Sequence, residues 1–422
     1  MDSIDVRSII MDINHKRLSI KAFEELLPSK RLERLALTYE LDATQSIKLS
    51  GPLMFLTLLR TILSHQEVSL RLMADDFLDA TGVQLHYSTL SKRLSRMTVE
   101  YFHDVFDYLA KVLKDEINPK SHGPLSVRIV DATTVTLSAK LCLFAIKSRT
   151  NQHGGTHGSI KTIISLEGKM PTFLHLCSTK SELSDNVAIG DTVSSISEPG
   201  QLWVFDRGCE SRDKLFAIHN TGAFFLTPHH TQGLRVDRVV WESGSSAPPS
   251  HIPRCKENDY VITRVEECVF ESSAWSSKKF AKMPLAVMRG YRYDWRKREG
   301  WKPLDLMTNM PISEDGTMIG PYTFEEVGRL YRNRWQIETF FKKIKGHLSF
   351  DHLLNRSQNG IEIMIYMTLI AAMLMIWYRL KTQMTDGWNI VKYWLNLSSI
   401  EWIEIVIIRC HRTPLLVRCR GS

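Results

Sequence analysis

Four residues in the last quarter of the chain have side chains and a spacing that could do chemistry together: Tyr331, Arg334, Glu338 and Lys345. Their separations are close to whole turns of an α-helix, so they fall on one stripe about 60° wide. A single carboxylate with cations one and two turns away suits a metal ligand whose neighbours hold phosphate groups. The alternative is an ordinary solvated helix face with salt bridges.

The helix that positions this stripe is expected to begin near Thr323 and to end at Gly346. Thr323 and Glu326 have the spacing of a capping box, and glycine is common where a helix ends, although Gly328 could break the helix near its start. A second, apolar stripe predicts that the helix packs on a core with one flank open. This stripe consists of Leu330, Ile337, Phe341, Ile344 and Leu348.

The segment from residue 331 to 345 resembles the YREK signature of bacterial insertion-sequence DDE transposases. In that signature Tyr, Arg, Glu and Lys are separated by two, three and six residues, and this chain matches the spacing without a gap. The resemblance implies a ribonuclease-H-like core in which Glu338 is the third metal-binding acid and two aspartates lie upstream on strands. It also implies that Tyr331, Arg334 and Lys345 contact the DNA backbone near the cut.

Two aspartates each follow a short apolar run that is typical of a buried strand. Asp131 follows residues 125–130, and Asp206 follows residues 201–205. A single Asp after a strand is often only a turn former or a helix cap, but the pair suits ligands on adjacent strands. Residues 206–208 also resemble the Asp-Arg-Gly that carries the second acid of the family. Asp185 is a competitor, but its polar surroundings predict a loop, so we leave it out of the metal site.

Asp131, Asp206 and Glu338 are therefore the expected catalytic and metal-binding residues. Their oxygens suit hard divalent cations, and we expect two Mg²⁺ ions about 4 Å apart, with Mn²⁺ as a substitute. Such a pair of ions makes a water or a 3′-hydroxyl nucleophilic and stabilises the leaving 3′-oxygen. Without metal, three crowded acids repel one another, so at least one should be partly protonated.

Composition describes an ordinary globular protein with room for two or three domains. The chain has 422 residues, 43% of them apolar and 24% charged, and its net charge of +8 permits a polyanionic partner without proving one. Seven scattered cysteines without a C-x-x-C pair indicate neither a disulfide framework nor a zinc site, which fits a reducing cytosol. The N-terminus lacks a signal-peptide core. We expect a location in the bacterial cytoplasm, with the nucleoid.

The first 118 residues have helical periodicity, with a candidate helix-turn-helix near Gly82. Its second helix, over residues 88–97, would expose Lys92, Arg93 and Arg96 to DNA. A plain helical hairpin explains the same pattern. The resemblance favours DNA binding, because such transposases usually carry an N-terminal domain that holds the ends of the element.

Further along the chain the apolar residues recur with the two-residue period of strands. Strands are expected at 125–130, 159–166, 172–176 and 201–205, and further alternating runs between 234 and 310 predict a mostly β insertion, or else a β domain of unrelated use. Residues 361–380 are apolar almost all round, but their uninterrupted run is shorter than the roughly 20 residues that a bilayer needs. A buried helix, with no membrane, is the expectation.

The fold class that follows is α/β, with a ribonuclease-H-like catalytic core interrupted by a mostly β insertion domain and preceded by a helical N-terminal domain. The expected divisions are a DNA-binding domain at 1–118, core at 119–206, insertion at 207–320, core at 321–400 and a basic tail at 401–422. The expected function is Mg²⁺-dependent cleavage and strand transfer at the terminal inverted repeats of an element, on double-stranded DNA and by a homodimer. A nuclease on the same fold and a non-catalytic DNA-binding descendant are the alternatives.

Overall fold

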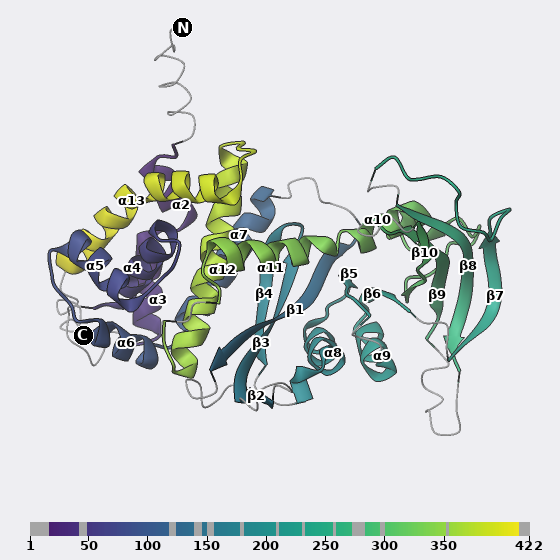
Figure 1. Ribbon diagram of the computed structural model, residues 1–422, viewed down its shortest axis with the longest axis horizontal. Coiled ribbons are helices and arrows are strands. Elements are labelled where there is room, and N and C mark those ends of the chain that lie inside the picture. Colours follow the sequence, from purple (N-terminus) through teal and green to yellow (C-terminus); the bar gives the residue numbers. More distant parts are fainter. Residues whose placement is uncertain are drawn as a thin grey trace, which may run out of the picture.

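The computed structural model describes residues 17–41, 49–117, 124–138, 146–149, 156–177, 181–207, 211–229, 233–255, 259–271, 283–295, 300–351 and 354–412. A helical part lies beside a long sheet, and helix α11 (Trp335–His347) runs from one toward the other (Figure 1). The last ten residues of the expected basic tail and Gly208 of the Asp-Arg-Gly motif lie outside the described residues.

The N-terminal part is helical, as its periodicity predicts. Serine side chains cap several helices: Ser19, Ser50 and Ser69 each accept a backbone N–H of the first turn. Pro28 divides an apolar stretch that looks continuous in the sequence, because proline cannot continue a helix. The helices are α2 (Ile20–Leu26), α3 (Ser29–Thr38), α4 (Gly51–Ser64), α5 (Leu70–Thr81), α6 (Tyr87–Arg96) and α7 (Val99–Ile117).

Two long C-terminal helices, α12 (Gln358–Lys381) and α13 (Trp388–Arg412), return to pack among the N-terminal helices (Figure 1). By length and composition α12 could cross a membrane, but 94% of its most apolar window is buried inside the protein. It packs against α4, α6, α7 and α13 and against strand β4 (Met170–Cys177), which confirms the expected buried helix. Helix α13 also crosses the expected boundary at residue 400.

The core strands are β1 (Ser126–Ser138), β2 (Ile146–Arg149), β3 (Thr156–Glu167), β4 (Met170–Cys177), β5 (Gln201–Val204) and β6 (Phe224–Pro228). β1 pairs antiparallel with β3 and parallel with β5, and β6 extends the sheet parallel to β5. Both faces are covered, so alternate residues enter different clusters: Ile129 packs toward α11 and α12, and Val130 toward α8 (Asp185–Ile196) and α9 (Arg212–Asn220). Asp131 lies within β1 and not at its end as expected, because the strand continues to Ser138.

The strands of the expected insertion extend this same sheet. β11 (Leu306–Thr308) pairs with β6 on one side and with β9 (Leu285–Tyr293) on the other. β8 (Tyr260–Phe270), β7 (Leu234–Glu242) and β10 (Trp301–Pro303) complete an 11-stranded sheet among the described residues. The boundary at 206 separates β5 from β6, although the two strands pair directly.

The expected helix from Thr323 to Gly346 is two helices, α10 (Phe324–Arg332) and α11 (Trp335–His347), which follow the short hairpin of β12 (Met318–Ile319) and β13 (Tyr322–Thr323). The capping box of Thr323 and Glu326 is present as predicted. The break falls at Asn333 and Arg334 and not at Gly328, which lies inside α10. There the chain closes a tighter turn, with the Arg334 N–H bonded to the carbonyl of Tyr331.

Candidate active site

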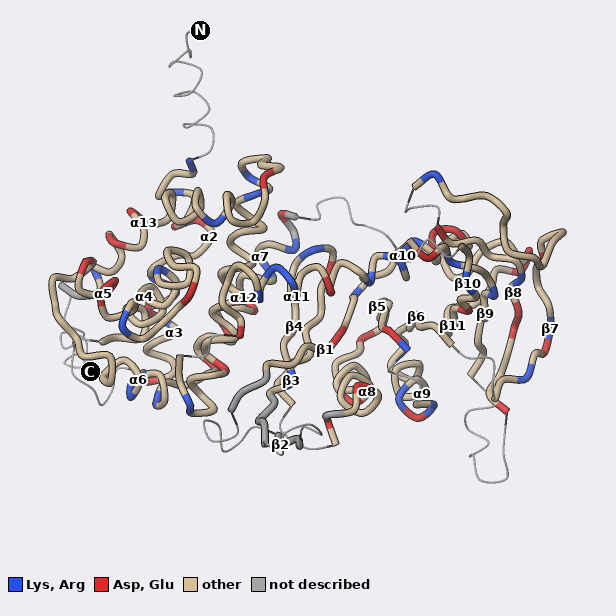
Figure 2. The backbone as a smooth tube through the Cα atoms, in the orientation of Figure 1, with Lys and Arg blue, Asp and Glu red and all other residues tan. Residues whose placement is uncertain are grey.

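Three carboxylates far apart in the sequence meet around one guanidinium. The Nη2 atom of Arg334 lies 2.7 Å from Oε1 of Glu338 and 3.5 Å from Oδ2 of Asp206. Its Nη1 atom lies 3.9 Å from Oδ2 of Asp131. Figure 2 shows the acidic positions on β1 and just after β5 near the middle of the sheet. The structure therefore brings together the three acids that the sequence singles out.

Local structure explains how each acid reaches this point. Asp131 shares the parity of Ile129 on β1, so its side chain leaves the sheet on the side where α11 packs. Asp206 follows the end of β5, the parallel neighbour of β1. Glu338 lies in the first turn of α11, one turn after Arg334. Two neighbouring strands and one helix thus supply the three carboxylates.

Arg334 is nearly buried, with 5% of its surface exposed. Burial alone would lower its pKa, but the neighbouring groups, above all Asp206, raise the pKa above its ordinary value. The guanidinium is therefore a fixed cation within a cluster of acids. It reduces the repulsion that would otherwise accompany three ionised carboxylates at one place.

The fold raises the proton affinity of Asp131. Burial raises its pKa to about 6, and the nearby charges of Asp206 and Asp185 add to this effect. A hydrogen bond from the Ala132 N–H to Oδ1, 2.8 Å long, and the charge of Arg334 act in the opposite direction. The main cause is burial and not the repulsion among crowded acids on which the expectation of partial protonation rests.

Tyr331 also contacts one of the three acids. Its hydroxyl donates to Oδ1 of Asp206 at 3.4 Å, and the same oxygen accepts the Arg207 N–H at 2.8 Å. Burial, followed by the charge of Asp206, raises the pKa of Tyr331 to about 12. The phenol therefore stays protonated at neutral pH and serves as a hydrogen-bond donor.

Lys345 lies on the same face of α11, two turns beyond Glu338. Its Nζ donates to the carbonyl oxygen of Thr134 at 3.1 Å and lies 3.9 Å from Asp351. Thr134 is three residues beyond Asp131 on β1, so this contact helps to hold α11 along the strand that carries the first acid.

Asp185 begins α8 and does not lie in the expected loop. Its Oδ1 lies 2.6 Å from Nζ of Lys161, a lysine that is 3% exposed on β3. Lys161 has the parity of Ile163, whose cluster packs against α8, whereas Asp131 faces α11. Asp185 therefore lies across the sheet from the three acids. The sequence predicts no partner for Asp185, and the only signal for Lys161 is that it lies within an apolar strand.

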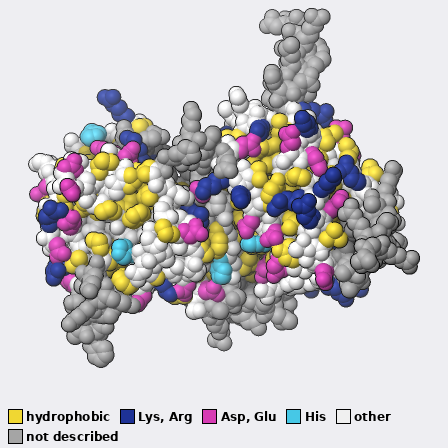
Figure 3. Space-filling model, turned by 180° about the vertical axis from the view of Figure 1, so that it is seen from behind, with side chains coloured by type: hydrophobic (Ala, Val, Ile, Leu, Met, Phe, Trp, Pro, Cys, Tyr) yellow, Lys and Arg dark blue, Asp and Glu magenta, His cyan; other side chains and the backbone are white. Residues whose placement is uncertain are grey.

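The three basic residues of the expected recognition helix are not equivalent. Lys92 and Arg96 of α6 are exposed, but Arg93 is 5% exposed and donates from Nη2 to the carbonyl of Leu41 at 2.7 Å. The expected exposure of Arg93 is therefore wrong, because this side chain fastens α6 to the chain after α3. Figure 3 shows Lys and Arg side chains over the helical half of one face with Asp and Glu between them, so net charge alone does not locate a DNA surface.

The three carboxylates fit a hard divalent cation by their chemistry, because all the donors are oxygens and a cation already lies between them. Their oxygens are spread around the guanidinium. Within the described part of the chain, the one set of three candidate ligand atoms closer than 4.8 Å to each other belongs to His175, Cys177 and Glu182.

The proteins to which this chain is similar are described as transposases. A family model described as "Transposase DDE domain" matches residues 122–374, which include all three acids. "Putative transposase y4zB" of Sinorhizobium fredii is 26% identical over 279 residues, or 66% of this chain and 67% of that protein. "Putative transposase for insertion sequence element IS4SA" of Synechocystis sp. is 23% identical over 362 residues, or 82% of this chain and 89% of that protein.

A solved structure, "Cryo-EM structure of piggyBac transposase synaptic complex with hairpin DNA", is similar with a TM-score of 0.44 and 10% sequence identity. The match covers 95% of this chain and 83% of that chain.

Proposed function

We propose that this chain, which belongs to the family of transposases with a DDE domain, binds the terminal repeats of an insertion sequence and moves it by cut-and-paste transposition. Family membership makes the protein a transposase, an enzyme that binds and cuts or transfers DNA and uses divalent metal ions. The proposal adds the reaction course, Mg²⁺ as the ion with Mn²⁺ as a substitute, and membership of the YREK group.

The observation that carries the proposal is the meeting of Asp131, Asp206 and Glu338 around Arg334. The strand order β4-β3-β1-β5-β6, with β1, β5 and β6 parallel and β3 antiparallel, supports a ribonuclease-H-like core. On that core Asp131 lies on β1 and Asp206 follows the end of the adjacent strand β5, an arrangement that suits the resemblance.

In this proposal Asp131, Asp206 and Glu338 hold the divalent ions. Such ions supply Lewis-acid stabilisation of the leaving oxygen and a nucleophile at neutral pH. Tyr331, Arg334 and Lys345 hold the DNA backbone beside the acids, because a phenol, a guanidinium and an ammonium are all donors to phosphate oxygen. Arg334 then exchanges carboxylate partners for phosphate, to which it can donate bidentately.

The rest of the assembly follows from the substrate. Exposed Lys92 and Arg96 of α6 are proposed to contact the terminal repeats. Two ends of one element must be cut together, so a homodimer in the DNA complex is proposed. Chromosomal DNA as target places the protein in the bacterial cytoplasm with the nucleoid.

The test uses the full chain with a duplex that contains the terminal repeat of the element and Mg²⁺. Glu338→Gln should reduce cleaved and joined products by at least about 100-fold, because an amide is a poor ligand for hard cations. Binding of the same duplex should stay within about threefold of the unchanged protein, since Glu338 is not a phosphate contact. The matched control is Glu325→Gln at an exposed position of α10, and this variant should cut DNA normally.

Three results would contradict the proposal. Full cleavage by Glu338→Gln would remove this residue from the site, and loss of binding together with cleavage would make its role structural. Nicked products without joined strands from the unchanged protein would indicate a nuclease.

A further inference from the structure

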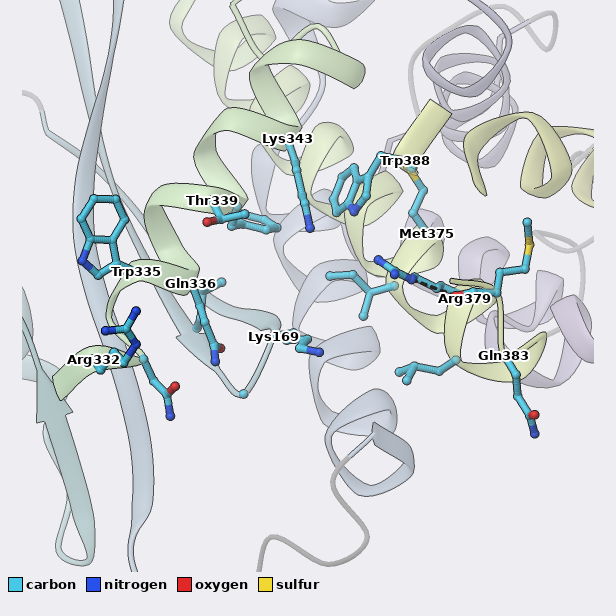
Figure 4. Close-up of a pocket in the computed structure, with 17 residues that line it drawn as sticks. Lys169, Arg332, Trp335, Gln336, Thr339, Lys343, Met375, Arg379, Gln383 and Trp388 are labelled. Carbon is cyan, nitrogen blue, oxygen red and sulfur yellow. Dashed lines mark hydrogen bonds between the residues drawn. The ribbon is translucent and has the colours of Figure 1, made fainter. Parts of the chain in front are cut away.

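A groove of about 780 Å³ lies on the far side of α11 from the three acids. It is formed by the turn between β3 and β4, the junction of α10 and α11, the end of α12 and the start of α13 (Figure 4). On α11 it is lined by Trp335, Gln336, Thr339 and Lys343. At about 100° per residue, Gln336, Thr339 and Lys343 point roughly 100–180° away from Arg334, Glu338 and Lys345, and Trp335 lies at the edge between the two faces.

The lining is basic. Four of the lining residues are Lys or Arg, and the described lining contains neither Asp nor Glu. Arg332 is paired with Asp259, but Lys169, Lys343 and Arg379 have no carboxylate partner within the described ranges. Figure 4 draws Lys169 between Gln336 and Arg379. Burial, and then the charges of Arg379 and Lys169, lower the pKa of Lys343, as expected where cations gather without an anion.

The structure holds Arg379 and Lys343 in place. Arg379 donates from Nε to the carbonyl of Met384 at 2.9 Å and from Nη2 to that of Thr385 at 3.2 Å. The Nζ of Lys343 lies 5.3 Å from the centre of the Trp388 ring, the geometry of a cation–π contact. Each has a fixed position but no neutralising charge, so an anionic ligand would complete the site.

The floor of the groove is apolar and aromatic. Phe340, Met375, Met384 and Trp388 are buried there, and Trp335 is partly exposed at one side. A groove that combines cations with aromatic rings is typical of proteins that bind single-stranded nucleic acid, because phosphates contact the cations and bases stack on the rings. An all-basic surface for duplex DNA has no need of such a floor.

We propose that this groove binds single-stranded DNA, with phosphates at Lys169, Lys343 and Arg379 and bases over the apolar floor. The inference rests on the proposed function for the source of the strand, which is a strand separated next to the cut. Arg332 and Asn333 of the groove directly precede Arg334, so one end of the groove begins beside the residue that contacts the acids. The junction between α10 and α11 lies between the two sites.

The experiment measures binding of a fluorescein-labelled oligo(dT) of 12 nucleotides to the full chain by anisotropy, over a series of salt concentrations. Lys169→Ala with Lys343→Ala should weaken binding at least about tenfold and reduce the slope of log K against log salt by about 1.4, because each phosphate contact to single strands contributes about 0.7. Lys342→Ala, an exposed neighbour on α11 outside the groove, is the control and should bind as the unchanged protein does.

Unchanged oligo(dT) binding by the double variant would overturn the inference. Equal weakening for a duplex of the same length would overturn the preference for single strands. A strand that carries 5-iodouracil should crosslink to the peptide containing the partly exposed Trp335, and crosslinks confined to other peptides would also overturn the inference. Glu338→Gln should bind oligo(dT) as the unchanged protein does, because Glu338 lies outside the groove. If the unchanged protein cuts terminal DNA but the double variant binds oligo(dT) normally, the groove is refuted and the proposed function is not. A protein that cuts no DNA but needs the groove for oligo(dT) refutes only the proposed function.

Discussion

At the scale of single residues, Arg334 gives the site its character. It is buried, it lies within 4 Å of all three acids, and its charge takes the place between them that divalent cations are proposed to fill. The same guanidinium is the best phosphate donor in the neighbourhood. One side chain can therefore stabilise the protein without metal and contact DNA when metal is bound.

Asp131 gives a pH-dependent prediction for the metal-free protein. Its pKa is raised to about 6 in the fold, so its contribution to stability is fully present below the unfolded value near 4 and is lost as the pH rises through 6. Asp131→Asn removes this dependence. Between pH 4 and pH 7 the unchanged protein should therefore lose up to about 3 kcal/mol of its free energy of unfolding relative to the variant.

Urea unfolding in the presence of a chelator measures this difference. Asp315→Asn is the control with the opposite sign, because hydrogen bonds from Ser313 and Thr317 lower the pKa of Asp315. That variant should lose stability relative to the unchanged protein below about pH 4, as the pH rises from the lowered pKa to the unfolded value, and the difference should then stay constant up to pH 7. A constant difference between Asp131→Asn and the unchanged protein at all pH values would show that Asp131 is not buried as an acid.

At the scale of elements, the position of α10 on β8 decides where Tyr331 and Arg334 lie. Gly328 of α10 faces the ring of Tyr260 on β8, and a Cβ atom at Gly328 would lie 2.5 Å from Cδ1 of that ring. Tyr260 is held in turn by the carbonyls of Met288 and Leu304, which its hydroxyl approaches at 3.4 and 3.3 Å. The glycine therefore allows a close approach of helix to sheet and does not break the helix.

Gly328→Ala should lower the free energy of unfolding by about 1–3 kcal/mol, because the added methyl group displaces a packed ring. Cleavage of terminal DNA should fall as well, since α10 leads directly into Arg334. Gly346→Ala on α11 is the matched control, because no atom lies within 4 Å of its added Cβ. It should stabilise the protein by up to about 1 kcal/mol through helix propensity. Equal effects of the two substitutions in thermal unfolding would refute the close contact.

At the scale of the whole molecule, the two ends of the chain build one helical body next to the sheet (Figure 1). Arg60 of α4, 7% exposed, lies 2.9 Å from Glu404 of α13 and 3.9 Å from Asp76 of α5. Lys392 of α13 donates to the carbonyls of His65 and His347, which lie at the ends of α4 and α11. The helical body therefore supports the helix that carries Glu338.

Arg60→Met should lower the free energy of unfolding by about 1–3 kcal/mol, because it removes the charge-assisted hydrogen bond at 2.9 Å between Arg60 of α4 and Glu404 of α13. Asp76 keeps its contacts with Thr61 and His65. Lys21→Met removes an exposed pair with Glu25 at 3.7 Å and should change stability by less than about 0.5 kcal/mol. Chemical denaturation of both variants makes the comparison. A loss below about 1 kcal/mol for Arg60→Met would show that this pair does not join the two ends of the chain.

The sequence by itself determined the local elements and the chemistry of the candidate site. Apolar periodicity located the helices and most strands, and the capping box at Thr323 was readable because both its hydrogen bonds are local. The spacing from Tyr331 to Lys345 identified the stripe and, through resemblance, the two aspartates upstream. Short-range hydrogen bonds and alternating burial leave such patterns in any one stretch of chain.

Only the tertiary structure decided what depends on residues distant in the sequence. It brought Asp131, Asp206 and Glu338 to Arg334, buried Arg93, and continued the core sheet through β11 into the expected insertion. Burial and strand pairing between distant segments depend on the packing of the whole chain, and no local pattern records them. The basic groove behind α11 also depends on the tertiary structure. Its three cations without a carboxylate partner among the described residues come from a β-turn and two helices that meet only in the fold.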